Sequence, residues 1–202
     1  MAEIVQTFVL LWAVIDPIGT VPVFLAVTRR HKPEELKKIA IQAILFAASV
    51  LIFFIIAGQF LLEAMGVSLI AFQISGGLVL FVFAFNMIFG ESKPEEELRI
   101  VKSGSDTAIF PLAVPAIAGP GAMMAVVLLT DNHRFDLIHQ VTTTGILIAI
   151  LLIQLLLLLL APRIGKLIGE SGASLISRVM GIILAAVAMN SVLLGLKQYF
   201  QL

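Results

Sequence analysis

The sequence contains no cysteine in its 202 residues. This absence excludes disulfide bonds, thiolate nucleophiles and thiolate metal sites. The three histidines lie at or near the ends of apolar runs, so a buried imidazole cluster is not expected. We therefore expect neither a metal site nor a cofactor.

Charged residues are also scarce, at 13% of the chain, which is about half of the usual share. Apolar residues make up 60% and the mean hydropathy is +1.09, whereas a soluble domain is about 45–50% apolar. The formal net charge is zero and no sustained basic stripe is present, so no nucleic-acid partner is expected. This composition predicts an all-α, multi-pass protein of the cell membrane, surrounded by lipid.

Six apolar runs are each close to the roughly 20 residues that a helix needs to cross a bilayer. They cover residues 4–28, 39–62, 68–89, 108–130, 137–160 and 175–197, and we number them one to six. The chain starts with Met-Ala-Glu, which lacks a basic segment, so we interpret the first run as a retained span and not a signal peptide.

The basic residues indicate the orientation of these spans. Eleven of the thirteen Lys and Arg fall in the loops after runs one, three and five, and only Arg134 and Lys197 lie on the opposite side. Loops rich in Lys and Arg stay in the cytoplasm. The sequence therefore predicts that both termini face outward.

The first run contains a helix-breaking segment, Asp-Pro-Ile-Gly-Thr-Val-Pro, at residues 16–22. Pro17 and Pro22 each remove a backbone donor and clash with the preceding turn. Asp16 is the only acidic residue well inside an apolar run. A carboxylate and an opened backbone at this depth need protein or water around them. We expect this break to form half of a substrate site.

The fourth run repeats this pattern, because Pro115 and Pro120 have the same spacing of five as the two prolines of the first run. Runs three and six also match, since Gly, Leu, Ala and Asn recur with spacings of 3, 4 and 2 and end at Asn86 and Asn190. Two three-span halves, residues 1–92 and 108–202 joined by a cytoplasmic linker at 93–107, must then be inverted in the membrane. Inverted repeats with interrupted helices are a recurrent plan of secondary transporters.

The broken helices suggest what the site would bind. A half-helix start exposes unpaired amides with partial positive charge, which suits a carboxylate. Gly19 and Thr20 precede one such start, and Gly119, Pro120 and Gly121 form the other. Asp16 would pair with a substrate ammonium or take up a proton. The alternative is that Asp16 caps its own half-helix or satisfies the opened backbone, and the two roles can coexist.

Three further polar residues lie within the runs. Asn86 and Asn190 are either ligands or, more simply, packing residues that hydrogen-bond the broken helices. Gln154 is interpreted as a packing hydrogen bond and not as a ligand.

The motifs DPIGTVPVF, ISGGLVLFVFAFNMIFG and PLAVPAIAGPGAM resemble those of the MarC family of integral membrane proteins, and the likeness extends over essentially the whole chain. The nearest resemblance is to archaeal SnatA-like transporters, which move glycine and alanine. This resemblance implies secondary transport of small neutral amino acids, driven by protons or, alternatively, sodium. From the paired breaks themselves we expect substrate contacts from Asp16, Pro17, Gly19, Thr20, Pro115, Gly119, Pro120 and Gly121, with Asn86 and Asn190 as candidates.

Three other functions remain open at this point. The same site could export amino acids or amphiphilic drugs, because a gradient-coupled carrier is reversible. An intramembrane hydrolase is disfavoured, since aspartyl chemistry needs two close carboxylates and only Asp16 is deep in a run. A channel or purely structural role is the third. Exposed Leu-rich faces would permit a homodimer.

Overall fold

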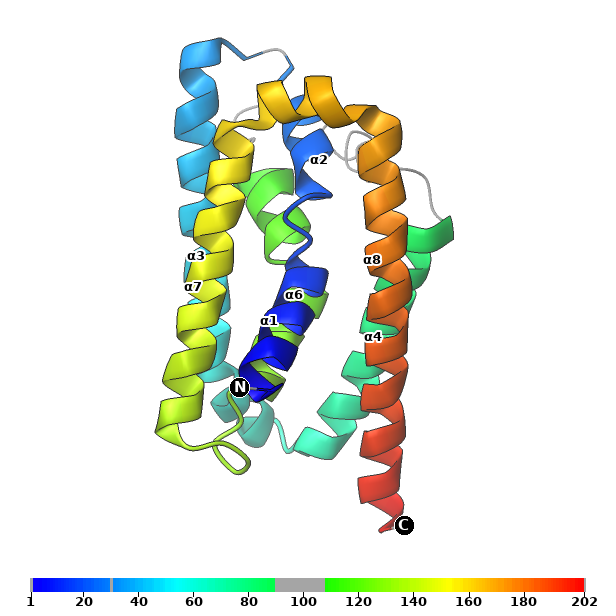
Figure 1. Cartoon of the computed structure of the whole chain (residues 1–202). Coiled ribbons are helices and arrows are strands. Elements are labelled where there is room, and N and C mark those ends of the chain that lie inside the picture. Colours follow the sequence, from blue (N-terminus) through cyan, green and yellow to red (C-terminus); the bar gives the residue numbers. More distant parts are fainter. Residues whose placement is uncertain (1, 30, 90–107, 202) are drawn as a thin grey trace.

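The computed structural model describes residues 2–29, 31–89 and 108–201, and every regular element within these ranges is helical (Figure 1). The elements are α1 (Ala2–Ile15), α2 (Thr20–Val27), α3 (Pro33–Ala64), α4 (Leu69–Phe89), the π-helical segment η1 (Ala108–Ile117), α6 (Pro120–Leu129), α7 (Leu137–Leu159) and α8 (Ala161–Phe200). The linker expected at 93–107 lies outside the described residues.

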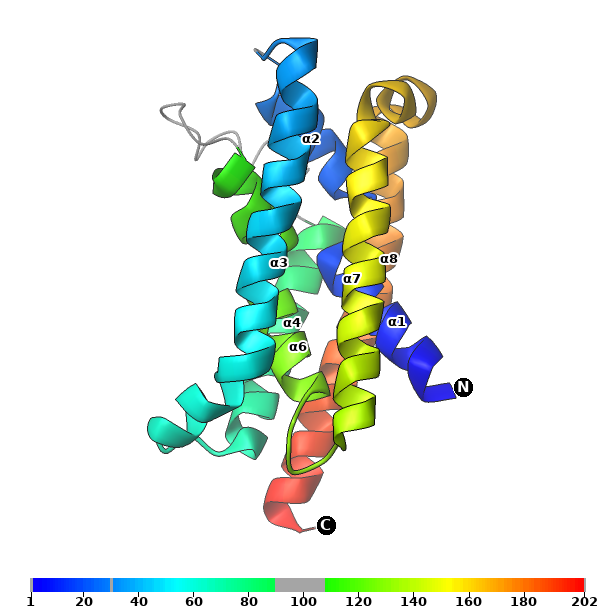
Figure 2. The ribbon, with the colours of Figure 1, turned by 90° about the vertical axis from the view of Figure 1, so that its left-hand side faces the viewer.

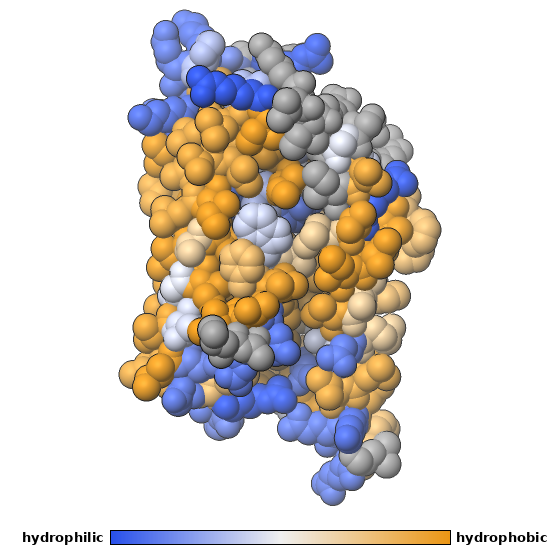
Figure 3. Space-filling model, in the orientation of Figure 1, coloured by the Kyte–Doolittle hydropathy of each residue, from blue (hydrophilic) through white to orange (hydrophobic). Residues whose placement is uncertain are grey.

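The helices correspond to the six apolar runs. Among the described residues, five candidate spans are long and apolar enough to cross a membrane: Glu3–Val27, Pro33–Ala64, Leu69–Phe89, Leu137–Leu159 and Arg178–Phe200. Pro111–Ile117 and Pro120–Leu129 supply a sixth when this bent pair is counted as one span. Figure 3 shows an apolar belt between two hydrophilic ends, as a membrane-spanning bundle requires.

Two stretches that lie between the apolar runs are helical. Residues 33–38 belong to α3, because Pro33 starts the helix and the backbone N–H of Lys32 donates to Oε2 of Glu35 at 3.0 Å. Residues 161–174 form the start of α8, with Pro162 in its first turn. Figure 1 shows this part of α8 lying across the upper end of the bundle before the helix turns downward.

α4 and α8 form a tight antiparallel pair, and glycine makes their close approach possible. A Cβ on Gly77 of α4 would lie 2.9 Å from the carbonyl oxygen of Ala188 on α8. A Cβ on Gly181 of α8 would lie 3.1 Å from the carbonyl oxygen of Ala84 on α4. Small residues at such contacts are how helices associate in lipid, where no hydrophobic force drives them together.

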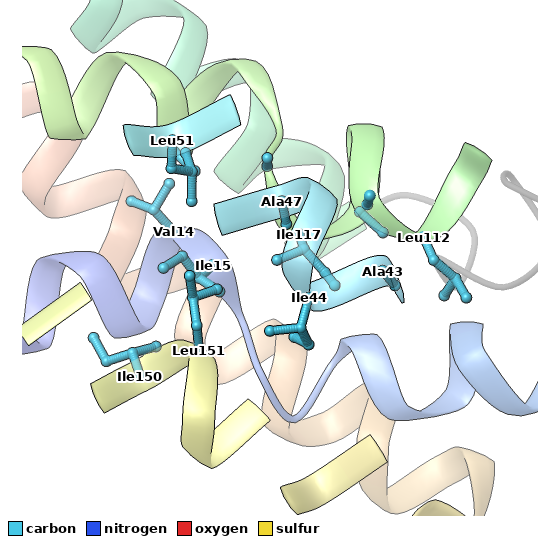
Figure 4. Close-up of a cluster of buried hydrophobic side chains, with 14 of the residues drawn as sticks. Val14, Ile15, Ala43, Ile44, Ala47, Leu51, Leu112, Ile117, Ile150 and Leu151 are labelled. Carbon is cyan, nitrogen blue, oxygen red and sulfur yellow. The ribbon is translucent and has the colours of Figure 1, made fainter. Parts of the chain in front are cut away.

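The first and fourth runs cross inside the bundle. α1 packs on α6, and α2 packs on η1, so the first half of each run meets the second half of the other. α3 and α7 lie side by side and cover one flank of this crossing (Figure 2). Figure 4 shows the apolar centre, where Ile15 of α1, Ile117 of η1 and Leu151 of α7 converge.

Both termini lie in the lower half of Figure 1, opposite the α2–α3 and α7–α8 connections at its upper end. From the middle of the bundle, α2 runs up toward those connections and α6 runs down toward the termini. The two half-helices therefore start near the same depth and point in opposite directions.

Candidate functional site

The first break, residues 16–19, is built around Asp16. Its side chain is 2% exposed, and its backbone has the left-handed φ of +50°, which aspartate tolerates better than most residues. The backbone N–H of Gly19 donates to Asp16 Oδ1 at 3.0 Å. Asp16 therefore satisfies an amide of the opened backbone, while the N-cap of α2, Gly19, makes no side-chain capping bond.

The same residue keeps the first run nearly continuous. The backbone N–H of Thr20 donates to the carbonyl oxygen of Asp16 at 3.1 Å, and the Thr20 hydroxyl donates to that oxygen at 2.9 Å. The N–H bond spans four residues, as in an α-helix. Glu3–Val27 consequently counts as one span despite its interruption. In this structure the Gly19 amide, expected to contact a substrate carboxylate, is already bonded to Asp16.

The second break, residues 118 and 119, differs from the first. The axes of Pro111–Ile117 and Pro120–Leu129 meet at 54°. Gly119 is the N-cap of α6, and a Cβ on Gly119 would lie 2.8 Å from the carbonyl oxygen of Pro115, so this turn needs glycine. Gly119 carries no side chain, and Pro120 in the first turn has no N–H. Within the described chain, α6 therefore starts without a side-chain cap.

The two breaks lie together inside the protein. A Cβ on Gly121, the second residue of α6, would lie 3.3 Å from Cγ1 of Val14, two residues before Asp16. It would also lie 2.7 Å from Cδ2 of Leu80 on α4. Gly121 is buried, so its lack of a side chain lets the three helices approach closely.

The electrostatic character of the two breaks is opposite. The first break holds a buried carboxylate, while the second presents the amide end of α6, which carries partial positive charge. A negative pole and a positive pole at neighbouring breaks suit a small molecule with one ammonium and one carboxylate group. They do not suit an extended apolar ligand.

The remaining candidate residues are distributed unevenly. Pro17, Gly19 and Thr20 are buried with Asp16, whereas Pro115 and Gly119 are half-buried and Pro120 is exposed. Asn86 and Asn190 lie on exposed faces of α4 and α8, so the structure does not bring them to the breaks. The breaks thus collect the Pro and Gly motifs but not the asparagine pair.

A polar network at the lower end of the bundle was missed by the sequence reasoning. Gln73 of α4 receives a hydrogen bond from Nη1 of Arg134 at 3.1 Å and donates one to the carbonyl oxygen of Ser191 on α8, also at 3.1 Å. Gln59 of α3 accepts from the backbone N–H of Asn132 at 2.9 Å. These bonds tie α3, α4 and α8 to the α6–α7 connection. Only the residue types, and not their pairing, were visible in the sequence.

The role predicted for Gln154 of α7 is wrong. The sequence predicts a packing hydrogen bond, but neither Nε2 nor Oε1 has a partner, although the side chain is 0% exposed. Asp131 after α6 is also fully buried. Its Oδ1 accepts from the backbone N–H of His133 at 2.9 Å, and its Oδ2 has no partner. Burial of this kind depends on tertiary packing. The position of Asp131 at the end of an apolar run does not reveal it.

Comparison with known proteins gives a consistent family assignment. The model of the MarC family of integral membrane proteins matches residues 1–200. A UPF0056 membrane protein of Aquifex aeolicus is 32% identical over 197 residues, covering 96% of this chain and 92% of its own. The UPF0056 inner membrane protein YhgN of Escherichia coli is 30% identical over 204 residues, covering 100% of both chains. A UPF0056 membrane protein of Buchnera aphidicola is 28% identical over 200 residues, covering 99% of each.

No solved structure matches this chain. The family model and the full-length relatives agree with the observed architecture, in which apolar helices cross a membrane several times. The chain is therefore a multi-pass integral protein of the cell membrane that belongs to the MarC family.

Proposed function

We propose that this protein is a secondary transporter of small neutral amino acids such as glycine and alanine, which it binds between the two breaks. One observation carries the proposal: the buried carboxylate of Asp16 and the uncapped start of α6 lie at adjoining points, with Gly121 against Val14. Each pole alone has simpler explanations, but together they complement both charges of an amino acid.

The proposed binding mode follows from these poles. The substrate ammonium pairs with Asp16, while the substrate carboxylate accepts from the first free amides of α6, those of Gly121 and Ala122. Gly19 and Thr20 hold the Asp16 turn through their bonds to it. Val14 and Leu80 pack closely against Gly121 and hold the start of α6 against α1 and α4.

Asp16 is also the proposed site of proton coupling. It is the acidic group at the first break, and a proton or a substrate ammonium would neutralise the same carboxylate. Sodium is the alternative coupling ion, since a carboxylate and freed carbonyl oxygens are its usual ligands in transporters.

The proposed transport cycle uses two inverted three-helix repeats, with both termini outside the cell. The opposite directions of α2 and α6, the reciprocal glycine contacts of α4 and α8, and the crossed packing of runs one and four support this arrangement. The basic residues Arg29, Lys32, Lys37, Lys38 and Arg163 lie around the α2–α3 and α7–α8 connections, which we assign to the cytoplasmic side.

The distribution of buried carboxylates favours a carrier over an intramembrane aspartyl hydrolase. Asp16 and Asp131 are both buried, but Asp131 follows the far end of α6. Ten helical residues of α6 span about 15 Å, which separates the two acids. Paired-carboxylate chemistry needs the two groups in contact.

A thermal-shift screen of the purified protein tests the proposal. Glycine and alanine are expected to raise the melting temperature, because a ligand that binds only the folded state stabilises it. Acetate and methylamine, which each carry one of the two charges, are the matched controls and should give no shift at the same concentration. A shift with acetate as large as that with glycine would indicate a simple anion site, and no shift with any of the twenty amino acids would reject the proposal.

A further inference from the structure

Gln154 is a buried carboxamide without a partner near the C-terminal end of the apolar helix α7. It belongs to the buried face of α7, together with Thr143, Leu147, Ile150, Leu151 and Leu158. Its side chain is 0% exposed, and neither its nitrogen nor its oxygen makes a hydrogen bond. Buried polar atoms are almost always bonded, so this exception requires an explanation.

The other buried glutamines of the described chain show what a structural role looks like. Gln73 uses its oxygen for Arg134 and its nitrogen for the carbonyl oxygen of Ser191. Gln59 uses its oxygen for the N–H of Asn132 and its nitrogen for Oε1 of Glu63. Both residues are satisfied at both ends by protein groups. Gln154 differs from them in having no such partner at either end.

Helix geometry puts Gln154 near the level of the first break. Figure 4 shows Ile150 and Leu151 of α7 beside Ile15, the residue before Asp16. α7 and the first run both ascend in Figure 1, and α7 packs on both α1 and α2. Gln154 is three residues beyond Leu151 on the same face, which is about 5 Å farther along the helix. The segment of the first run at that level is the one that follows Ile15, residues 16–19.

A carboxamide at this point has a chemistry that the two breaks lack. It supplies one acceptor and two donors while remaining uncharged, so it can accept from an ammonium and donate to a carboxylate. Apolar Leu residues occupy the neighbouring positions of the run, and a Leu at 154 would leave no polar atom unbonded. A polar residue that gains nothing from the protein itself is explained if a ligand provides its partner.

We propose that Gln154 is a third polar contact of the substrate site and that its carboxamide hydrogen-bonds the bound amino acid. This inference rests on the proposed transport function. Asp16 then supplies the negative pole, the start of α6 the positive pole, and Gln154 a neutral group that hydrogen-bonds a zwitterion held between them. This role reverses the packing role expected from the sequence.

The test combines stability and binding in the purified full-length protein. Gln154→Leu removes the unbonded amide at nearly constant volume, and Gln73→Leu is the matched variant of a bonded buried glutamine. Gln154→Leu should raise the melting temperature of the ligand-free protein by about 2 °C or more, since unbonded buried amides destabilise. It should also weaken glycine binding about tenfold, as expected for a lost buried hydrogen bond. Gln73→Leu should lower the melting temperature and change glycine affinity by less than about twofold.

The outcomes separate this inference from the function on which it rests. If the wild-type protein binds no amino acid, the proposed function fails and the inference fails with it. If the wild-type protein binds glycine and Gln154→Leu binds it equally well, the function stands and the role of Gln154 is rejected. A drop in melting temperature for Gln154→Leu as large as that for Gln73→Leu would also reject it, because it would show that protein groups satisfy the amide.

Discussion

Gly77 of α4 and Ala188 of α8 approach so closely that a Cβ on the glycine would lie 2.9 Å from the alanine carbonyl oxygen. Gly181 and Ala84, their counterparts 104 positions away in the other half, make the same contact at 3.1 Å with the helices exchanged. A reciprocal contact of this kind is what a two-fold relation between α4 and α8 produces. It ties the internal repeat of the sequence to a packing interface.

The first prediction concerns this interface. Gly77→Ala should lower the melting temperature by several degrees, because overpacking costs about 1–3 kcal/mol and about 1 kcal/mol shifts the midpoint of a chain this size by roughly 2–4 °C. The measurement is thermal unfolding in detergent. Gly145→Ala in α7 is the control, since a Cβ there meets nothing within 4 Å. Equal effects of the two substitutions would contradict the close α4–α8 contact.

The second prediction concerns the turn at the second break. Gly119→Ala should weaken glycine binding and lower stability, because its Cβ would lie 2.8 Å from the carbonyl oxygen of Pro115 and would displace the start of α6. Gly66→Ala is the control, because it should lower stability without affecting glycine binding. Gly66 has a φ of +69° and open space around its Cβ position, so alanine there strains the backbone far from the breaks. Calorimetric titration with glycine should detect a lower affinity in Gly119→Ala and an unchanged affinity in Gly66→Ala.

The third prediction concerns the network at the lower end. Arg134→Ala leaves the oxygen of the buried Gln73 without its partner, and Gln73→Leu removes two part-buried hydrogen bonds, so each should destabilise the protein by about 1–3 kcal/mol. Because the two side chains share one hydrogen bond of 3.1 Å, the double variant should lose less than the two losses added together. Strictly additive losses in a double-mutant cycle would show that the bond does not contribute to stability.

The spans and both breaks could be predicted from the sequence for simple physical reasons. A bilayer demands about 20 apolar residues per crossing, and the six runs satisfy that length directly. Proline and glycine disturb a helix wherever they occur, so the interruptions near Pro17 and Pro120 follow from local chemistry. A lone carboxylate within an apolar run is expected to need a partner, and the Gly19 amide provides one for Asp16.

Features that depend on tertiary partners could not be predicted in the same way. Asn86 and Gln154 are both lone amides in apolar runs, yet the first is exposed and the second fully buried. Only the packing of α7 against the first run distinguishes them. The two breaks also differ in geometry, although their motifs are alike. The fourth run bends by 54° at its break, whereas the first run counts as one span. Bonds from Thr20 to Asp16 explain that difference, because the first position of α6 is Pro120, which has neither an N–H nor a hydroxyl to make them.

Asp16 provides the most direct test of the whole account, because it belongs to the first break and is also the proposed partner of the substrate ammonium and of the coupled proton. Asp16→Asn retains an oxygen for the Gly19 amide and a residue type that tolerates φ of +50°, so the fold should survive with a melting temperature within about 2 °C of wild type. The substitution replaces the charged carboxylate by a neutral carboxamide of nearly the same shape.

The decisive measurement is uptake of labelled glycine into proteoliposomes under an imposed proton gradient, for the wild-type protein and Asp16→Asn side by side. The account predicts gradient-driven uptake by the wild type and none by the variant. Uptake by Asp16→Asn at the wild-type rate would contradict the claim that the two breaks form a charged substrate site.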